Sequence, residues 1–270
     1  MTTKKKTSIW LWVKIILIIY AVVGIALYYL QDKILFHPRP LAQNHTWNFP
    51  YPFKEVNIPY AANSRMNIIQ FTADSIPKGV VLYFHGNRHN IGRYARVVPS
   101  FTKNGWEIWM LDYPGFGKST GEFTEQKMYE WALVFYKLAR ARFEPANIIV
   151  YGRSMGTGIA TQLASVRDCR YLVLEAPYYS FPSIFNTYLP IYPYERMIKY
   201  DFPTYKYITN VTAPIVIFHG TADEIIPYRN GKKLVPLLKK TDEFLSINGA
   251  FHNDLDSFPM YTNKLDSILR

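Results

Sequence analysis

The chain has 270 residues, a formal net charge of +11 and a single cysteine, Cys169. One cysteine permits no internal disulfide, and no cluster of cysteine and histidine has metal-site spacing, so we expect neither a disulfide framework nor a bound metal. Residues 1–40 supply +5 of the charge. The other +6 would favour an anionic membrane surface or anionic substrates, but we interpret it as a generally basic, soluble surface, and no basic run or motif after the N-terminus indicates a nucleic-acid partner.

The N-terminal segment predicts a membrane anchor. Residues 1–8 include three consecutive lysines, and residues 9–30 are almost wholly apolar, with Lys14 as the only charge. This run of about 22 residues is long enough to cross a hydrocarbon core of roughly 30 Å as a helix. Lys14 can extend its amine to the interface. Aromatic residues lie near both ends of the run, as in membrane-spanning helices: Trp10, Trp12, Tyr28 and Tyr29.

Two other interpretations of this segment are less consistent with the sequence. A cleaved signal peptide has a shorter apolar region, and the best cleavage-like site, Gly24-Ile25-Ala26, lies inside the run. A buried core helix would not be apolar on every face beside lysines. We therefore expect an uncleaved signal anchor over residues 9–30. The early lysines predict that residues 1–8 are cytoplasmic and that the rest lies on the opposite side, periplasmic or extracellular in a bacterium.

Residues 31–270 have the length and pattern of one α/β domain. Short β-branched and aromatic runs alternate with helical stretches, which we predict at residues 122–142, 156–165 and 231–240. This alternation predicts a mostly parallel, twisted sheet flanked by helices.

The first strand with a chemically informative end covers residues 78–84 and leads into His85-Gly86-Asn87. Gly86 allows the backbone to turn close to a substrate carbonyl. We expect the N–H of Asn87 to be one oxyanion donor. His85 is interpreted as a residue that orders this loop rather than as a base.

The next strand, residues 106–112, runs into the glycine-rich sequence Tyr113-Pro114-Gly115-Phe116-Gly117-Lys118-Ser119. Its last residues resemble part of a phosphate-binding loop. The first glycine of that motif would have to stand at position 112, which is Asp112, so we exclude a phosphate loop.

The string Tyr151-Gly152-Arg153-Ser154-Met155-Gly156 is the most informative motif. It follows the β-branched run 148–150 and precedes a helical pattern, which is the context of a nucleophile elbow. The elbow strains the serine backbone, so small residues must flank it. We predict Ser154 as a nucleophile and the N–H of Met155 as the second oxyanion donor.

A serine nucleophile requires a base, and the base requires an orienting acid. Asp223 follows the buried strand at 213–219, and His252 follows another strand and turn, so both are predicted at carboxyl ends of strands. Glu175, at the end of an earlier strand, is an alternative acid, and Asp223 has the alternative role of a helix cap. His219, which precedes a glycine at a strand end, is interpreted as structural.

Five segments together resemble the α/β-hydrolase superfamily: His85–Asn87, Asp112–Gly117, Gly152–Gly156, His219–Asp223 and His252–Asp254. More narrowly, the chain resembles single-pass, N-terminally anchored serine hydrolases related to eukaryotic protein depalmitoylases. The resemblance runs from about residue 30 to the C-terminus and includes Asp32–Pro40. Phe251 departs from the pattern, because relatives usually have glycine before the histidine. A bulky side chain there could alter the histidine loop or narrow the acyl site.

This resemblance implies a triad of Ser154, Asp223 and His252, and a short lid at residues 177–211 that covers the active site. That segment is rich in tyrosine, phenylalanine and proline, which suits an acyl chain. The alternative for this segment is a packed loop without substrate contact. The expected activity is cleavage of carboxylic esters or thioesters of an acylated small molecule, lipid or protein, without a cofactor. The alternatives are a peptidase or amidase of the same fold, and a non-catalytic membrane-tethered binding protein.

Overall fold

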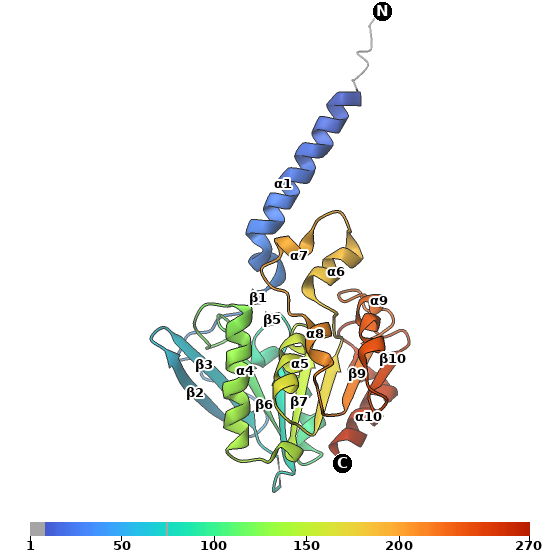
Figure 1. The fold of residues 1–270 in the computed structure, drawn as a ribbon. Helices are drawn as coiled ribbons and strands as arrows, with labels where there is room; N and C mark the ends of the chain where they lie inside the picture. The colour runs from blue at the N-terminus through green and yellow to red at the C-terminus, as the bar shows by residue number, and fades with distance from the viewer. Residues whose placement is uncertain (1–8, 74) are drawn as a thin grey trace, which may run out of the picture.

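The computed structural model describes residues 9–73 and 75–270 (Figure 1). The basic segment 1–8, predicted to be cytoplasmic, lies outside the described residues. Helix α1 (Ile9–Leu35) extends away from the rest of the molecule, and by length and composition it is the one helix in the described part that could cross a membrane. It continues past the predicted end at residue 30, and the side chain of Gln31 in this extension is buried and bonded to Met197 and Lys199.

An eight-stranded sheet forms the centre of the domain, in the order β10-β9-β8-β7-β4-β6-β3-β2. The strands from β10 to β6 are parallel, whereas β3 pairs antiparallel with both β2 and β6. The bounds are β2 (Phe53–Ala61), β3 (Ser64–Phe71), β4 (Gly79–Phe84), β6 (Trp106–Asp112), β7 (Ile148–Arg153), β8 (Tyr171–Glu175), β9 (Ile215–Gly220) and β10 (Glu243–Ile247). The predicted sheet, mostly parallel and flanked by helices, is confirmed.

Alternate residues of the central strands face two separate cores. In β4, Leu82 packs with α4 (Glu125–Arg140) and α5 (Gly156–Val166), whereas Tyr83 packs with α3 (Val98–Thr102) and α10 (Pro259–Leu269). β4 is buried on both faces, which explains why its sequence is a continuous apolar run.

Two of the three predicted helices correspond to α4 and α5. The third, at residues 231–240, is wrong as a regular helix: the structure has the short α9 (Tyr228–Gly231) followed by a 3₁₀ helix, Lys232–Leu237. Pro236 lies inside this segment and has no N–H to continue an α-helical ladder. Other 3₁₀ helices are Ala95–Val97, Pro145–Asn147 and Leu255–Ser257.

The segment between β8 and β9 carries three short helices, α6 (Phe181–Tyr188), α7 (Tyr194–Met197) and α8 (Thr204–Ile208). α8 packs on α5, whereas α6 and α7 lie at the base of α1 (Figure 1). A second, two-stranded sheet pairs β1 (His37–Pro38), which follows α1, with β5 (Arg88–His89), which is followed by α2 (Ile91–Tyr94). The end of α1 is thereby tied to the loop after β4.

Candidate active site

Ser154 occupies a sharp turn between β7 and α5. Its φ is +51°, in the left-handed region that few residues with a side chain adopt. The turn is held on both sides, because the N–H of Ser154 donates to Glu175 O (2.8 Å) and the N–H of Thr157 donates to Ser154 O (2.9 Å). The serine therefore stands at the carboxyl edge of the sheet and at the N-terminal end of α5, where negative charge is favoured.

The two flanking glycines are required by close backbone approach. A Cβ on Gly152 would lie 2.6 Å from the Cα of Thr157. A Cβ on Gly156 would lie 2.1 Å from the carbonyl oxygen of Phe84, on the neighbouring strand β4. No larger residue fits either position without displacing the backbone, so these glycines allow α5 to approach both β7 and the loop after β4.

The structure brings Ser154, His252 and Asp223 together from three separate loops. His252 Nε2 lies 3.0 Å from Ser154 Oγ, and His252 Nδ1 lies 2.8 Å from Asp223 Oδ2. All three residues are buried. With Asp223 ionised, Nδ1 carries the proton that it donates, which leaves Nε2 free to accept the hydroxyl proton of Ser154.

The carboxylate of Asp223 is fixed by its own loop. Its Oδ1 accepts the backbone N–H groups of Ile225 (2.9 Å) and Ile226 (2.7 Å), while Oδ2 faces His252. Glu224 Oε2 accepts the N–H of His252 at 3.1 Å and so links the two loops. Asp223 is not the helix cap considered as its alternative role, because the N-cap of α9 is Pro227 and Oδ1 of Asp223 bonds to N–H groups of its own loop.

His219 also lies near Asp223 and is fully buried. Its Nε2 is 2.9 Å from Ile226 O and 3.6 Å from Asp223 Oδ2. Burial lowers the pKa of His219, although the hydrogen bond and the nearby carboxylate partly oppose this effect. A neutral, enclosed imidazole in this position orders the acid loop, in agreement with its structural interpretation.

His85 also lies away from Ser154. Its Nδ1 is 2.7 Å from Gly86 O, and its Nε2 is 3.2 Å from Asp112 Oδ1. Burial raises the pKa of Asp112, with His85 acting in the opposite direction. Asp112 also accepts the N–H of Ile91 (3.0 Å), so this buried pair holds together the loops after β4 and β6.

Glu175, the alternative acid, is engaged elsewhere. Its Oε1 pairs with Arg153 Nη1 at 3.2 Å, and its Oε2 accepts the hydroxyl of Tyr151 at 2.6 Å. Arg153 in turn donates to Asn253 Oδ1 (3.2 Å), next to His252. The support that Arg153 gives to the histidine loop was not predicted from the sequence. Its signal is an arginine directly before the serine, at the end of a predicted buried strand, where a charge needs a partner.

The proposed oxyanion donors lie beside the serine. Met155 directly follows Ser154, and Asn87 lines the same pocket. Among the residues that the structure describes, neither backbone N–H donates to another backbone group. The side-chain amide of Asn87 donates to Leu35 O, and the backbone carbonyl of Asn87 accepts the N–H of His37 (2.9 Å). The end of α1 and the residues after it therefore support this loop.

A pocket of about 80 Å³ opens above Ser154 and His252. Its other lining residues come from the loop after β4, from α2 and β7, and from the loops of the acid and the histidine: Gly86, Asn87, Arg88, Arg93, Tyr94, Arg153, Ile225 and Asn253. No residue of segment 177–211 lines it in the described structure. The expected aromatic wall is instead packed elsewhere; Tyr178, for example, is buried and donates to Met155 O.

Phe251 does not narrow the pocket. Its side chain is 53% exposed and is not among the lining residues, while its N–H donates to Asp254 Oδ1 at 2.7 Å. The bulky residue before the histidine is accommodated because it points outward.

Comparison with known proteins gives relatives over most of the chain. The family described as serine aminopeptidase, S33, matches residues 75–200. Alpha/beta hydrolase domain-containing protein 17C of Xenopus tropicalis is 31% identical over 198 residues, which cover 70% of this chain and 61% of that protein. The human protein 17B is 30% identical over 201 residues, covering 71% and 66%. The chain thus spans less than two thirds of the length of these relatives.

Solved structures share the fold at low identity. An esterase of Pyrococcus furiosus superposes with a TM-score of 0.66 at 17% identity, covering 87% of this chain and 97% of that one. A monoacylglycerol lipase of Paleococcus ferrophilus superposes with a TM-score of 0.58 at 18% identity, covering 76% and 98%.

Proposed function

Because the chain belongs to the α/β-hydrolase superfamily, we propose that it is a membrane-anchored serine hydrolase of carboxylic esters or thioesters. The observation that carries this proposal is the hydrogen-bonded series from Ser154 Oγ to His252 to Asp223, at 3.0 and 2.8 Å. Nucleophile, base and orienting acid are all present and buried, and the nucleophile and the base line one pocket.

In the proposed mechanism, Ser154, His252 and Asp223 each have a defined role. His252 Nε2 takes the proton of Ser154 as Oγ attacks the acyl carbon, and Asp223 stabilises the imidazolium that forms. His252 then gives that proton to the departing alcohol or thiol, leaving an acyl group on Ser154. A water molecule, deprotonated by the same histidine, attacks the acyl-enzyme and releases the carboxylic acid.

The tetrahedral intermediate needs donors aimed at its oxyanion. The N–H groups of Met155 and Asn87 supply them in this proposal, and each such donor contributes roughly 3 kcal/mol to the transition state. Support for this assignment comes from their place beside Ser154 and from the strained turn, which fixes the N-terminal end of α5 beneath the developing charge.

The placement proposed for the catalytic domain is extracytoplasmic, with α1 as an uncleaved anchor. α1 is long and apolar, and its outer surface in the structure is exposed over residues such as Ile16, Ile18 and Val22. An apolar helix exposed in this way requires a lipid environment rather than water. The lysines that precede it favour a cytoplasmic N-terminus.

The test is hydrolysis of p-nitrophenyl acyl esters with chains of different length, together with the Ser154→Ala variant. We expect turnover by the unaltered protein and a fall in kcat of at least about 10⁴-fold in the variant. Labelling by a fluorophosphonate should also depend on Ser154. An aminoacyl p-nitroanilide separates the peptidase alternative. Neither turnover nor labelling of the unaltered protein would leave a tethered binding protein as the better account.

A further inference from the structure

The segment between β8 and β9 packs against the middle of α1. The rings of Tyr20 and Tyr192 stack with centroids 4.4 Å apart. The Tyr192 hydroxyl donates to Tyr20 O (2.7 Å), and the Tyr20 hydroxyl donates to Ile191 O (2.9 Å). Gly24, one turn further along α1, leaves room for the ring, since a Cβ there would lie 3.0 Å from Tyr192 Cε1.

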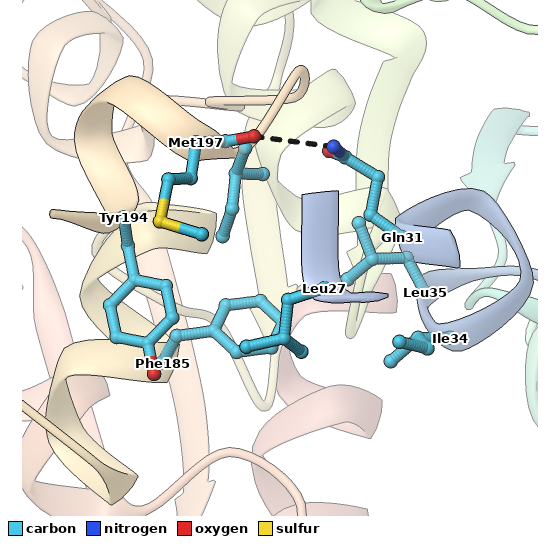
Figure 2. A pocket seen from close by; sticks show the side chains of 8 residues that line it. Leu27, Gln31, Ile34, Leu35, Phe185, Tyr194 and Met197 are labelled. Atoms are coloured by element: carbon cyan, nitrogen blue, oxygen red, sulfur yellow. Dashed lines mark hydrogen bonds between the residues drawn. The ribbon is translucent and has the colours of Figure 1, made fainter. Parts of the chain in front are cut away.

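Nearer the domain, the contact continues as an apolar crevice. Figure 2 shows Leu27 and Leu35 of α1 facing Phe185, Tyr194 and Met197. A second set of polar contacts closes its lower end: Gln31 Nε2 donates to Met197 O (3.2 Å), Gln31 Oε1 accepts the N–H of Lys199 (2.7 Å), and Lys199 pairs with Asp32 (3.3 Å). The described part of α1 carries no acidic residue before Asp32.

The length of α1 determines how deep these contacts lie. A helix rises about 1.5 Å per residue, so Tyr20 lies about 16 Å from Ile9 and about 18 Å from Asp32. A helix that begins at Ile9 uses about 20 residues to cross the hydrocarbon core. If residues 9–30 span the bilayer, the contact at Tyr20 therefore lies within it.

The chain at this contact has the composition required there. We define residues 188–193 as the lid tip: Tyr188, Leu189, Pro190, Ile191, Tyr192 and Pro193, without a charge. Leu189 and Ile191 are about half exposed, at 48% and 51%. The two prolines have no N–H, the N–H groups of Leu189 and Ile191 donate to Phe185 O and Leu189 O, and Ile191 O accepts from Tyr20. These bonds and the two prolines reduce the number of unpaired backbone groups that would enter lipid.

We propose that the lid tip is embedded in the bilayer leaflet on the catalytic side, and that the acyl chain of a lipid-resident substrate passes along it to Ser154. The Tyr188 hydroxyl donates to Glu224 O (2.8 Å) and Ile225 O (3.0 Å). Ile225, itself 44% exposed, lines the pocket of Ser154. The lid tip thus contacts both α1 and the loop of Ile225 at the edge of the pocket. The substrate part of this proposal rests on the proposed hydrolase function, whereas the depth of the lid tip does not.

The depth is tested in full-length protein in phosphatidylcholine vesicles. In a Cys169→Ser background, an environment-sensitive fluorophore is attached at Leu189→Cys or, as a matched control, at Val166→Cys. The two positions have nearly equal exposure, 48% and 46%, but Val166 ends α5 at the end remote from Ser154. Quenching by nitroxide on the acyl chains is expected at position 189 and not at 166. Equal weak quenching at both would overturn the proposal.

The route is tested by Leu189→Glu with Ile191→Glu. A charge in the hydrocarbon region is strongly unfavourable, so the ratio of hydrolysis of a vesicle-embedded long-chain ester to that of a soluble short-chain ester should fall about tenfold or more. An unchanged ratio in active protein would contradict the route. If the unaltered protein hydrolyses neither ester, the proposed function is contradicted. The quenching result would still test the depth of the lid tip.

A separate observation concerns the wall of the pocket that two arginines form. Arg88 lies in β5 and Arg93 in α2, and both are exposed. Within the described residues, neither forms an ion pair, whereas the third arginine, Arg153, is paired with Glu175. An adjoining cavity of about 290 Å³ continues along Arg93 and Arg96. Two unpaired guanidinium groups therefore face the space beside the serine.

We infer that this wall binds a phosphate-type anion on the leaving-group side of the substrate. Guanidinium groups bind phosphate oxygens with paired N–H donors, and Arg88 and Arg93 line the same pocket as Ser154. The inference rests on the proposed hydrolase function. It gives the substrate two distinct ends, an acyl chain toward the lid tip and an anion toward α2.

The probes are acyl esters of 4-hydroxyphenylphosphonate and of its neutral dimethyl ester. We expect the charged ester to be preferred in kcat/KM, and the preference to fall about tenfold in Arg88→Gln with Arg93→Gln, mainly through KM. The exposed Arg167, at the far end of α5, gives the control Arg167→Gln. Short-chain and vesicle-embedded long-chain versions distinguish a soluble phosphate ester from a lipid headgroup. A preference that survives the double substitution in both versions would overturn the inference.

Discussion

At the scale of single residues, Arg153 combines two structural tasks. It neutralises Glu175 below the pocket, and it bonds to the loop of His252 from the side. Both members of the pair are almost fully buried, so the charge of either one depends on the other. We therefore expect the loss of either partner to lower the free energy of unfolding of the domain.

We predict that Arg153→Leu lowers the free energy of unfolding of the domain by about 3–5 kcal/mol, because it leaves the Glu175 carboxylate buried without a counter-charge. Denaturant unfolding measures this change. The double variant Arg153→Leu with Glu175→Leu should recover most of the loss. A single variant as stable as the unaltered protein would show that Glu175 takes up a proton or finds another partner.

Asp223 permits a prediction on rate rather than stability. In Asp223→Asn, the amide can donate to His252 Nδ1, which favours the tautomer whose Nε2 holds a proton and cannot accept one from Ser154. We expect kcat to fall by about 10⁴-fold with little change in KM. Steady-state kinetics on a soluble ester measure both quantities. An unchanged kcat in Asp223→Asn would indicate that another acid orients His252.

His219 gives the domain a pH-dependent stability. Its pKa in the folded state is lowered by burial from the ordinary value of 6.5, so the unfolded chain binds a proton first as the pH falls. The free energy of unfolding is then largest above about pH 6.5 and decreases as the pH falls below that value toward the folded-state pKa, by up to about 1.4 kcal/mol per pH unit.

Unfolding at pH 7.5 and 5.5 tests this prediction in the unaltered domain and in His219→Asn. The substitution should reduce the loss of stability between the two pH values. The exposed His45, replaced in the same way, serves as the control and should leave that loss in place. An identical pH dependence in all three proteins would assign the effect to other groups.

At the scale of elements, the short strand β1 supports the loop of Asn87, the proposed oxyanion donor. β1 pairs with β5 directly after Asn87, and Leu35 and His37 bond to Asn87 from the two sides of Phe36. Further along, Arg39 O accepts from Asn90 Nδ2 at 2.9 Å. The segment 35–40 therefore supports the loop that carries one oxyanion donor.

We predict different results for two truncations. Removal of residues 1–30 leaves these contacts in place and should preserve hydrolysis of a soluble ester. Removal of residues 1–40 frees the loop at Asn87 and should lower kcat by roughly 10², the effect of losing one oxyanion donor. Circular dichroism checks that both domains are folded. An equal kcat in the two truncated proteins would show that β1 does not affect catalysis.

At the scale of the whole molecule, α1 and the segment between β8 and β9 lie at the same end of the domain (Figure 1), and contacts of the lid tip link α1 to the loop of Ile225 at the pocket. The carboxyl edge of the sheet faces the base of α1, because Asn87, which follows the carboxyl end of β4, bonds to Leu35 and His37. The proposed membrane attachment and the proposed catalytic site therefore occupy the same end of the protein.

The orientation across the membrane is a prediction of its own. Alkaline phosphatase fused after Arg270 is active only where its disulfides form, outside the cytoplasm. We expect an active fusion in a bacterial host, because the lysines before α1 retain the N-terminus inside. A cytoplasmic reporter fused at the same place should be inactive. The reverse pattern would place the catalytic domain in the cytoplasm.

Local patterns in the sequence were sufficient for the sheet, the elbow and the long helices. The alternation of apolar runs and helical stretches indicates a parallel sheet, and Gly152 and Gly156 around Ser154 indicate the turn, because these signals depend on neighbouring residues only. Pro236 was overlooked within the third helix, although its effect is equally local.

What tertiary structure decided is which distant side chains meet. From sequence, Glu175 and Asp223 were both candidate acids, and only the fold shows that Glu175 is bonded to Arg153 and Tyr151 while Asp223 faces His252. The aromatic residues of segment 177–211 suggested a wall around the acyl site, but they bury one another and stack on α1. Composition determines that such side chains avoid water; packing in three dimensions determines which apolar surface they cover.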